Sequence, residues 1–300
     1  MKAVMIMSYG TPSSVQEVGT YFTHIRGGRR PSDEEIYRLQ QRYVAIGGTS
    51  PLIKITESIA KKLQKSIKSD SSETKIYYAM KHSYPFISDV MMQMYEDGVK
   101  DVLGIVLAPH YSGMSIGTYL KTVNDTNERL GKAFNVEFIP SWYSHPSLIS
   151  VWKKRITEAL SKLPSDTMVI FTAHSLPKRI LEIGDPYQTE LKDMANLLAV
   201  QIGLQNWSFG YQSAGQTGES WLGPDVLELL ESLVEKNHKT FLLAPIGFIS
   251  DHLEVLYDID VECINWAKSR NVVLARTELP NDSDDFIACL HTLIKERGFS

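Results

Sequence analysis

The chain has 300 residues, of which 43% are hydrophobic and 22% are charged, and its formal net charge is -4 at pH 7. This composition is typical of a globular protein. The negative charge disfavours nucleic acid as a partner, because phosphate binding needs a basic surface. The two cysteines, Cys263 and Cys289, are too few for a disulfide framework or a cysteine-ligated iron–sulfur cluster and favour a reducing compartment.

Targeting and membrane signals are also missing from the sequence. The apolar run at residues 3–7 is too short for a signal peptide. No later run approaches the roughly 20 residues that span a bilayer. We therefore expect a cytoplasmic protein without integral membrane association.

Short apolar runs alternate along the chain with longer amphipathic segments. The predicted strands cover residues 3–8, 75–80, 102–108, 136–139, 168–172, 207–211, 240–244 and 272–275. The predicted helices cover residues 56–69, 85–97, 122–130, 146–162, 186–201, 223–236 and 255–269. Continuous apolar strands separated by helices indicate parallel sheets that are covered on both faces, so the fold class is α/β.

The two halves of the sequence are similar to each other. Residues 4–12, VMIMSYGTP, align with residues 169–177, VIFTAHSLP, and each half later repeats Leu-Ala-Pro, at 107–109 and 243–245. The repeat predicts two Rossmann-like domains with four-stranded parallel sheets, packed around one cleft.

We place the domain boundary near residue 150, which gives domains of residues 1–150 and 151–300, with the last helix able to pack back on the first. Ligands of open α/β sheets bind beyond the carboxyl ends of the strands. The residues just past such ends are Tyr9, His110, His174 and Phe248. Neither a phosphate-binding glycine loop nor a nucleophile elbow occurs in the sequence.

Three carboxylates, Glu254, Asp258 and Glu262, are spaced four residues apart. On an α-helix this spacing stacks them on one face, where like charges repel. A bound cation would relieve the repulsion. Two other interpretations stay open: Asp251 and Glu254 fit a capping box at a helix start, and a run of charge is usually a solvated face.

His174 ends an apolar strand in the same half of the chain as the acidic helix. An imidazole with carboxylates suits divalent iron, zinc or cobalt, and it can also move protons near neutral pH. A purely structural histidine is equally compatible with this position. His82 and His110 are weaker candidates, and His252 lies close to Glu254 in the sequence.

Two segments, 23–31 and 42–51, combine arginines with tyrosine and serine hydroxyls and glycine turns. Arginine offers a bidentate fork to a carboxylate, and hydroxyls complete the shell. The alternative is a basic loop that neutralises neighbouring acids. The residues alone therefore indicate a cleft for an anionic, planar or extended ligand and a divalent metal.

With these residues in view, the chain resembles the ferrochelatase family, and within it the soluble coproporphyrin-type enzymes of Gram-positive bacteria. The matching motifs are Tyr9-Gly10-Thr11-Pro12, Thr23-His24-Ile25-Arg26, Arg42-Tyr43, Ile46-Gly47-Gly48-x-Ser50-Pro51, Leu107-Ala108-Pro109-His110, Ala173-His174-Ser175-Leu176-Pro177, Gly184-Asp185-Pro186-Tyr187, Tyr211-Gln212-Ser213, Trp221-Leu222-Gly223-Pro224-Asp225 and the run 251–258. They occur in this order over essentially the whole length.

The resemblance implies a lyase-class metal chelatase that inserts Fe²⁺ into coproporphyrin III with release of two protons, in heme biosynthesis. Its alternatives are a protoporphyrin IX ferrochelatase, a cobalt-inserting relative and a non-catalytic porphyrin- or metal-binding protein. It further implies a monomer with porphyrin and Fe²⁺ as substrates, transient contact with heme-pathway enzymes, Mg²⁺ as an optional ion at an outer acidic site, and no iron–sulfur cluster.

The resemblance also implies roles for individual residues. His174 and Glu254 match the catalytic pair that faces the porphyrin centre and handles the metal. Tyr9 matches an axial ligand of the product iron, and Asp258 and Glu262 match an outer metal relay. The residues that match porphyrin-contacting positions are Arg26, Arg42, Tyr43, Ser50 and Tyr119.

Overall fold

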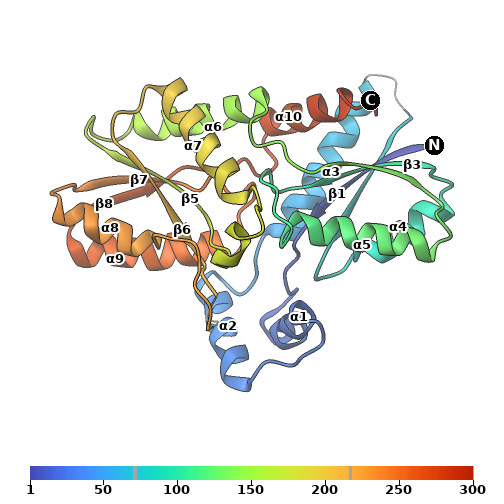
Figure 1. Ribbon diagram of the computed structural model, residues 1–300, viewed down its shortest axis with the longest axis horizontal. Helices are drawn as coiled ribbons and strands as arrows, with labels where there is room; N and C mark the ends of the chain where they lie inside the picture. The colour runs from blue at the N-terminus through green and yellow to red at the C-terminus, as the bar shows by residue number, and fades with distance from the viewer. Residues whose placement is uncertain (70–72, 216–217, 300) are drawn as a thin grey trace.

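The computed structural model describes residues 1–69, 73–215 and 218–299 and contains two four-stranded sheets (Figure 1). The first has the order β2-β1-β3-β4 and comprises β1 (Lys2–Ser8), β2 (Lys75–Met80), β3 (Asp101–Val106) and β4 (Asn135–Ile139). The second has the order β6-β5-β7-β8 and comprises β5 (Met168–His174), β6 (Trp207–Gln212), β7 (Thr240–Ala244) and β8 (Val273–Arg276). All pairings between these strands are parallel. The predicted α/β class with two four-stranded parallel sheets is confirmed.

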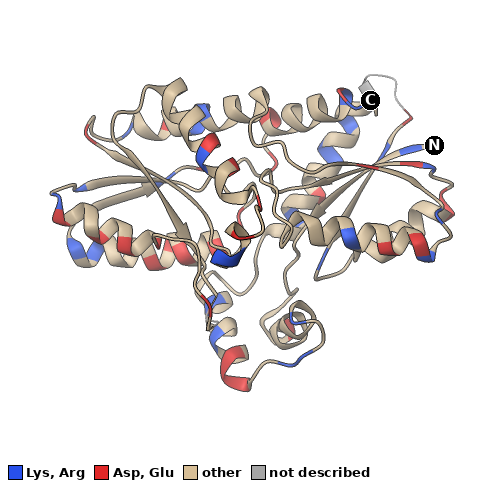
Figure 2. Ribbon diagram, viewed as in Figure 1, with Lys and Arg blue, Asp and Glu red and all other residues tan. Residues whose placement is uncertain are grey.

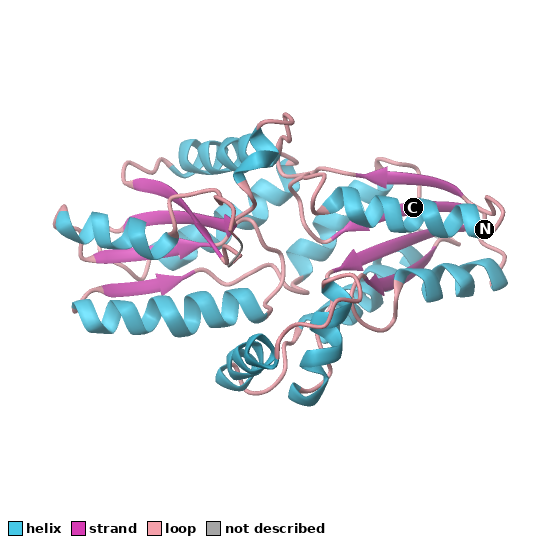
Figure 3. Cartoon of the chain, turned by 60° about the horizontal axis from the view of Figure 1, so that its bottom comes forward, coloured by secondary structure: helices cyan, strands magenta, loops and turns pink. Residues whose placement is uncertain are grey.

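Helices flank both sheets (Figure 3). The first half contains η1 (Val15–Glu17), α1 (Val18–Ile25), α2 (Asp33–Ala45), α3 (Leu52–Ser69), α4 (Ile87–Glu96), α5 (Ile116–Arg129) and α6 (Pro146–Leu160). The second half contains η2 (Lys178–Leu181), α7 (Tyr187–Ile202), α8 (Val226–Glu235), η3 (Val255–Cys263), α9 (Ile264–Arg270) and α10 (Asp284–Lys295). None of the described helices combines the length and hydropathy that a bilayer-spanning segment requires. Figure 2 shows both signs of charge on several of them, with acids grouped at the start of α2.

The central strand β1 is apolar along its length because helices cover both faces of its sheet. Val4 and Ile6 join a core that includes α3, whereas Met5 and Met7 join a core with α4 and α5. Alternate side chains of a strand point to opposite faces, so an uninterrupted apolar run is what two covered faces require.

The largest hydrophobic core runs through both halves of the chain. It contains Ile59 and Leu63 of α3 together with Leu290 and Ile294 of α10, and α10 packs against α3 and α6. The last helix therefore lies against the first half of the molecule (Figure 1). This packing holds the two sheets in one relative position.

Three observed α-helices, α1, α2 and α10, lie outside the predicted helix ranges. The carboxyl ends of α1 and α2 fall in the arginine- and glycine-rich segments 23–31 and 42–51. A capping box starts α2: the Ser32 hydroxyl accepts from the Glu35 N–H, and the Glu35 carboxylate accepts from the Ser32 N–H. The Ser-x-x-Glu spacing is the sequence signal of this start. In Figure 1 α1 and α2 project below the sheets.

The prediction of an α-helix over residues 255–269 is wrong in its first part. Val255–Cys263 forms a π-helix, labelled η3, and α9 continues it as an α-helix. A π-helix bonds each N–H to the carbonyl five residues earlier, so its turn is wider, and such segments are frequent at functional sites. The wide turn still keeps residues four apart near one another, so the spacing alone cannot distinguish the two helix types.

Candidate functional site

His174 and Glu254 form an ion pair at the carboxyl end of the second sheet. The buried strand β5 ends at His174, and Glu254 directly precedes η3. His174 Nε2 lies 3.3 Å from Glu254 Oε1, and each side chain is about a third exposed. Burial alone would lower the pKa of His174, but the Glu254 carboxylate raises it to about 9. The same attraction outweighs burial at Glu254 and holds the pKa of this carboxyl well below its usual range.

Main-chain and side-chain contacts orient this pair. The Tyr187 hydroxyl donates to the His174 carbonyl at 2.9 Å, and Gln212 Nε2 donates to the Glu254 carbonyl at 3.1 Å. His252 Nε2 lies 3.4 Å from Glu254 Oε2. The structure thus brings His252 to the pair, as its closeness in the sequence suggested, whereas no local sequence signal indicated the contacts of Tyr187 and Gln212.

Tyr9 approaches the pair from the other half of the molecule. It follows β1, and the next residue, Gly10, has φ +98°, where a Cβ would lie 2.5 Å from the Ser83 hydroxyl. The Tyr21 hydroxyl donates to the Gly10 carbonyl at 2.8 Å and holds this turn. Burial and then the Glu254 charge raise the pKa of Tyr9. Tyr9 thus lies near enough to Glu254 for the carboxylate charge to act on the phenol.

Of the acidic residues of η3, Asp258 does not lie on a solvated helix face, whereas Glu262 does. The Asp258 side chain is 6% exposed, pairs with Arg42 and accepts from the Ser213 hydroxyl. Burial raises the pKa of Asp258 to about 6, although Arg42 opposes the shift. Glu262 lies further along the helix and is exposed.

The capping-box interpretation of Asp251 and Glu254 is also wrong. The Asp251 carboxylate accepts from Arg276 at 3.0 Å and from Asn281 at 2.7 Å. The first turn of η3, all of it described, has no side-chain cap. The Glu254 carboxylate therefore makes no helix cap and pairs with His174 instead. This pair fits the metal and proton chemistry expected of an imidazole with carboxylates.

The predicted porphyrin-contacting residues divide into buried and surface positions. Tyr43 is buried with its hydroxyl 3.1 Å from the Thr11 hydroxyl, and Tyr119 is buried near enough for the Tyr9 phenol to influence its pKa. Ser50 is buried and accepts from the N–H at the start of α3. Arg26 lies apart from these residues, in an exposed bidentate pair with Glu35 at 2.8 and 3.2 Å.

A family model for ferrochelatase matches residues 1–298 of the chain. The chain belongs to the ferrochelatase family. The expected membership and the enzyme class, a metal chelatase, are thus confirmed. The "Ferrochelatase" of Herpetosiphon aurantiacus is 42% identical over 297 residues, which cover 97% of each chain. The "Coproporphyrin III ferrochelatase" of Geobacillus kaustophilus is 41% identical over 301 residues, 98% of this chain and 95% of that one.

Solved structures of other chelatases share the fold of this ferrochelatase-family chain at low sequence identity. "SirB from Bacillus subtilis with Fe3+" has a TM-score of 0.62 at 10% identity and covers 98% of this chain and 94% of that one. The structure of CbiX has a TM-score of 0.55 at 13% identity and covers 98% of each chain. These similarities confirm the paired-sheet architecture.

The weaker histidine candidates occupy two different places in the ferrochelatase fold. His82 packs against Tyr9, with 4.6 Å between ring centroids, and its Nδ1 lies 3.0 Å from Nδ1 of His24. His110 is 2% exposed, and neither ring nitrogen has a hydrogen-bond partner within the described part of the chain. Burial lowers the pKa of His110 to about 3, so it is a neutral packing residue.

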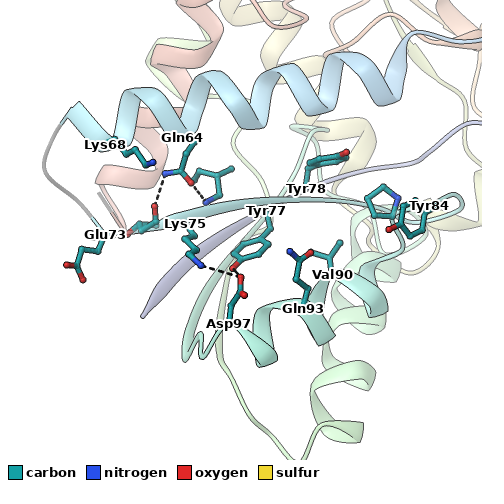
Figure 4. Close-up of a pocket in the computed structure, with 13 residues that line it drawn as sticks. Gln64, Lys68, Glu73, Lys75, Tyr77, Tyr78, Tyr84, Val90, Gln93 and Asp97 are labelled. Atoms are coloured by element: carbon teal, nitrogen blue, oxygen red, sulfur yellow. Dashed lines mark hydrogen bonds and ion pairs between the residues drawn. The ribbon is translucent and has the colours of Figure 1, made fainter.

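A hollow of about 650 Å³ lies away from this site, at the free edge of β2 (Figure 4). Residues of α3, β2 and α4 line it, including Gln64, Lys75 and Asp97. None of the predicted site residues belongs to its lining. Lys75 and Asp97 already form an ion pair at 3.3 Å across it. The hollow therefore lies apart from the predicted site residues.

Proposed function

We propose that the protein inserts Fe²⁺ into coproporphyrin III and releases two protons, as a step of heme biosynthesis. The observation that carries the proposal is the His174–Glu254 pair at 3.3 Å, whose carboxylate charge also acts on Tyr9 of the other half. Family membership and relatives named coproporphyrin III ferrochelatase support the choice of substrate. In this reaction two porphyrin N–H bonds break and iron–nitrogen bonds form, so Fe²⁺ replaces two protons.

Glu254 accepts the first pyrrole proton in this proposal. Its pKa lies well below the usual range, so the carboxylate is ionised at neutral pH, whereas His174, with a pKa of about 9, already carries its proton. An approaching Fe²⁺ favours loss of that proton, because like charges disfavour the protonated imidazole. Once its own proton has passed to solvent, His174 accepts the second pyrrole proton, and both pyrrole protons leave through the pair to solvent as Fe²⁺ takes their place on the porphyrin nitrogens.

Tyr9 serves as a neutral oxygen ligand on the opposite side of the porphyrin. Its pKa is raised, so it stays a phenol at neutral pH. A neutral oxygen contributes lone pairs to the product iron without adding a charge. The Tyr21–Gly10 hydrogen bond keeps the turn that carries Tyr9 in position.

The porphyrin-contacting residues of the proposal are Arg26, Arg42, Tyr43, Ser50 and Tyr119. Tyr43 and Tyr119 form buried wall positions near Tyr9. Arg26 binds a propionate by exchanging it for the Glu35 carboxylate, since the bidentate geometry is the same for both. Arg42 reaches the porphyrin from its pair with Asp258.

Asp258 and Glu262 form the outer relay for hydrated Fe²⁺. The donor set does not fit a directly bound Mg²⁺, because Arg42 occupies Asp258 Oδ1 and Ser213 occupies Oδ2. Mg²⁺ also prefers to keep several waters. No step of the mechanism depends on that ion.

Anaerobic Fe²⁺ uptake by coproporphyrin III and by protoporphyrin IX, followed by absorbance, tests the function. We expect turnover with coproporphyrin III and a preference for it. Glu254→Gln should lower kcat about 100-fold or more, because the ionised proton acceptor is lost. Glu262→Gln is the matched control and should mainly raise the KM for iron.

Other outcomes of this assay identify the alternatives. A preference for protoporphyrin IX would change the substrate but keep the enzyme. Inactivity with both porphyrins, together with tight porphyrin binding, would indicate a non-catalytic binding protein. Normal turnover by Glu254→Gln would exclude the proposed role of that carboxylate.

We also propose that the enzyme acts as a monomer in the cytoplasm and passes its product to later heme-pathway enzymes. One hydrophobic core contains residues of both sheets, which supports a chain that folds without a partner subunit. Sedimentation of the purified protein at micromolar concentration tests the monomer.

A further inference from the structure

The segment Asp185–Glu190, here called the α7 anchor, connects the second half of the chain to a loop of the first. Asp185 Oδ2 accepts from the Ser112 hydroxyl at 2.9 Å and from the Gly113 N–H at 2.8 Å. Glu190 Oε2 accepts from the Tyr111 N–H at 2.6 Å and from the Ser141 hydroxyl at 2.9 Å. Two carboxylates five residues apart thus bind two segments of the opposite half.

The same anchor holds the main chain of His174. The Tyr187 hydroxyl donates to the His174 carbonyl at 2.9 Å, and the Tyr187 N–H donates to Asp185 Oδ1 at 3.0 Å. Asp185 therefore uses one oxygen for the loop of the first half and the other for the residue that supports His174. Tyr187 is buried, so its hydroxyl has few alternative partners.

Aromatic side chains of the first half pack against Tyr187 of the anchor. The His110 ring stacks on Tyr143, with 5.8 Å between centroids, and meets Tyr187 edge-on at 6.5 Å. His110 has no hydrogen bond within the described residues, so it acts here through its shape. The Tyr187 ring is therefore buried against a packed aromatic cluster.

The loop that Asp185 holds leads directly into α5. In its first turn α5 carries Tyr119, whose ring lies 4.9 Å from Lys81 Nζ. Tyr119 is also the wall residue near Tyr9 in the proposed porphyrin site. The anchor thus joins one wall of that site to the histidine at its centre by an uninterrupted set of contacts.

We propose that Asp185, Tyr187 and Glu190 are positioning residues that set the distance between the α5 wall and His174. This inference rests on the proposed function of the same site. Asp185 and Glu190 fix the position of the loop before α5, and so of Tyr119, and thereby govern porphyrin binding. Tyr187 places the imidazole and so governs metal insertion.

The test compares Asp185→Asn, Tyr187→Phe and the double variant in the full-length protein. Asparagine has one acceptor oxygen where Asp185 has two, so the variant loses either the bonds to Ser112 and Gly113 or the bond from the Tyr187 N–H. Asp185→Asn should raise the KM for coproporphyrin III about tenfold, and Tyr187→Phe should lower kcat about tenfold with KM unchanged. Because Asp185 reaches His174 through Tyr187, adding Asp185→Asn to Tyr187→Phe should lower kcat no further.

Glu182→Gln is the matched control, since Glu182 is an exposed acid in the loop before the anchor. It should leave KM and kcat within twofold of wild type. Each variant is compared after circular dichroism has measured its folded fraction. Losses of activity that only follow the folded fraction would overturn the inference, and so would wild-type constants in both single variants.

The wild-type assay separates the two proposals. If wild type inserts Fe²⁺ and the anchor variants match it, the anchor inference fails and the function stands. If wild type inserts no metal into either porphyrin, the function itself fails. In that case the porphyrin affinity of Asp185→Asn, measured by fluorescence quenching, still tests whether the anchor positions Tyr119. An affinity equal to that of wild type overturns this role of the anchor.

Discussion

His110 ties the stability of this protein to pH. It is 2% exposed, and burial lowers its pKa from the usual value near 6.5 to about 3. Below pH 6.5 the unfolded chain binds a proton at this ring that the folded chain does not bind. The free energy of unfolding should therefore fall as the pH drops from 6.5 toward 3, by about 2 kcal/mol at pH 5 from this group alone.

The comparison of wild type with His110→Phe isolates this effect. Phenylalanine keeps a ring against Tyr143 and Tyr187 but cannot be protonated. Urea unfolding at pH 7 and pH 5 should show a smaller loss of stability for the variant than for wild type. An equal loss in both proteins would mean that His110 is protonated without cost in the fold.

For single residues, the sequence predicted where a residue lies in its strand or helix, but not which distant side chain it contacts. His174 and Tyr9 could be placed at strand ends because apolar runs stop just before or at them. That Arg42 pairs with Asp258, 216 residues away, could not be inferred. Such a contact depends on how α2 meets η3, and local patterns carry no information about it.

Among the elements, strands were easier to predict than helices. The predicted strands are confirmed with end shifts of up to two residues, because covered parallel strands must be apolar throughout. Helix starts were less clear, since α5 begins at Ile116 with Gly117 in its first turn. The capping box of α2 was a readable signal that the basic composition of residues 23–31 and 42–51 obscured.

The edge strand β2 depends on one side chain of α3. Gln64 Nε2 donates to the Thr74 carbonyl at 3.1 Å, and Gln64 Oε1 accepts from the Ile76 N–H at 2.8 Å (Figure 4). The amide thus occupies main-chain groups at the free edge of the sheet. Edges of this kind otherwise offer a template for pairing with another chain.

Replacing Gln64 with leucine should lower the free energy of unfolding by about 1–3 kcal/mol, because partners of main-chain polar groups are lost. It should also increase association at high protein concentration. Urea unfolding and light scattering measure the two effects. Lys65→Gln, an exposed change on the same helix, is the control. A Gln64→Leu protein as stable and monodisperse as this control would show that the edge needs no such cover.

At the scale of the whole molecule, the site exists because two similar halves share one core. The internal repeat predicted two sheets, but their relative placement follows from α10, which packs on α3 and α6. Lys62 of α3 donates to the Asp282 carbonyl at 2.6 Å, and Arg155 of α6 pairs with Asp285 at 3.0 Å. The division into two Rossmann-like domains at residue 150 stays our proposal, and the packing of α10 indicates that the two fold as one unit.

Leu290 offers a test of that unity, because it is fully buried in α10 within the core that both halves share. Leu290→Ala should lower the free energy of unfolding by about 2–5 kcal/mol through lost burial and the cavity left behind. If the halves fold as one unit, the variant should still unfold in a single transition, with coincident curves from far-ultraviolet circular dichroism and tryptophan fluorescence. Ala288→Ser, on the exposed side of the same helix, should change stability by less than about 0.5 kcal/mol. Two separated transitions in Leu290→Ala would instead mean that each half folds independently and that α10 packs against halves that are already folded.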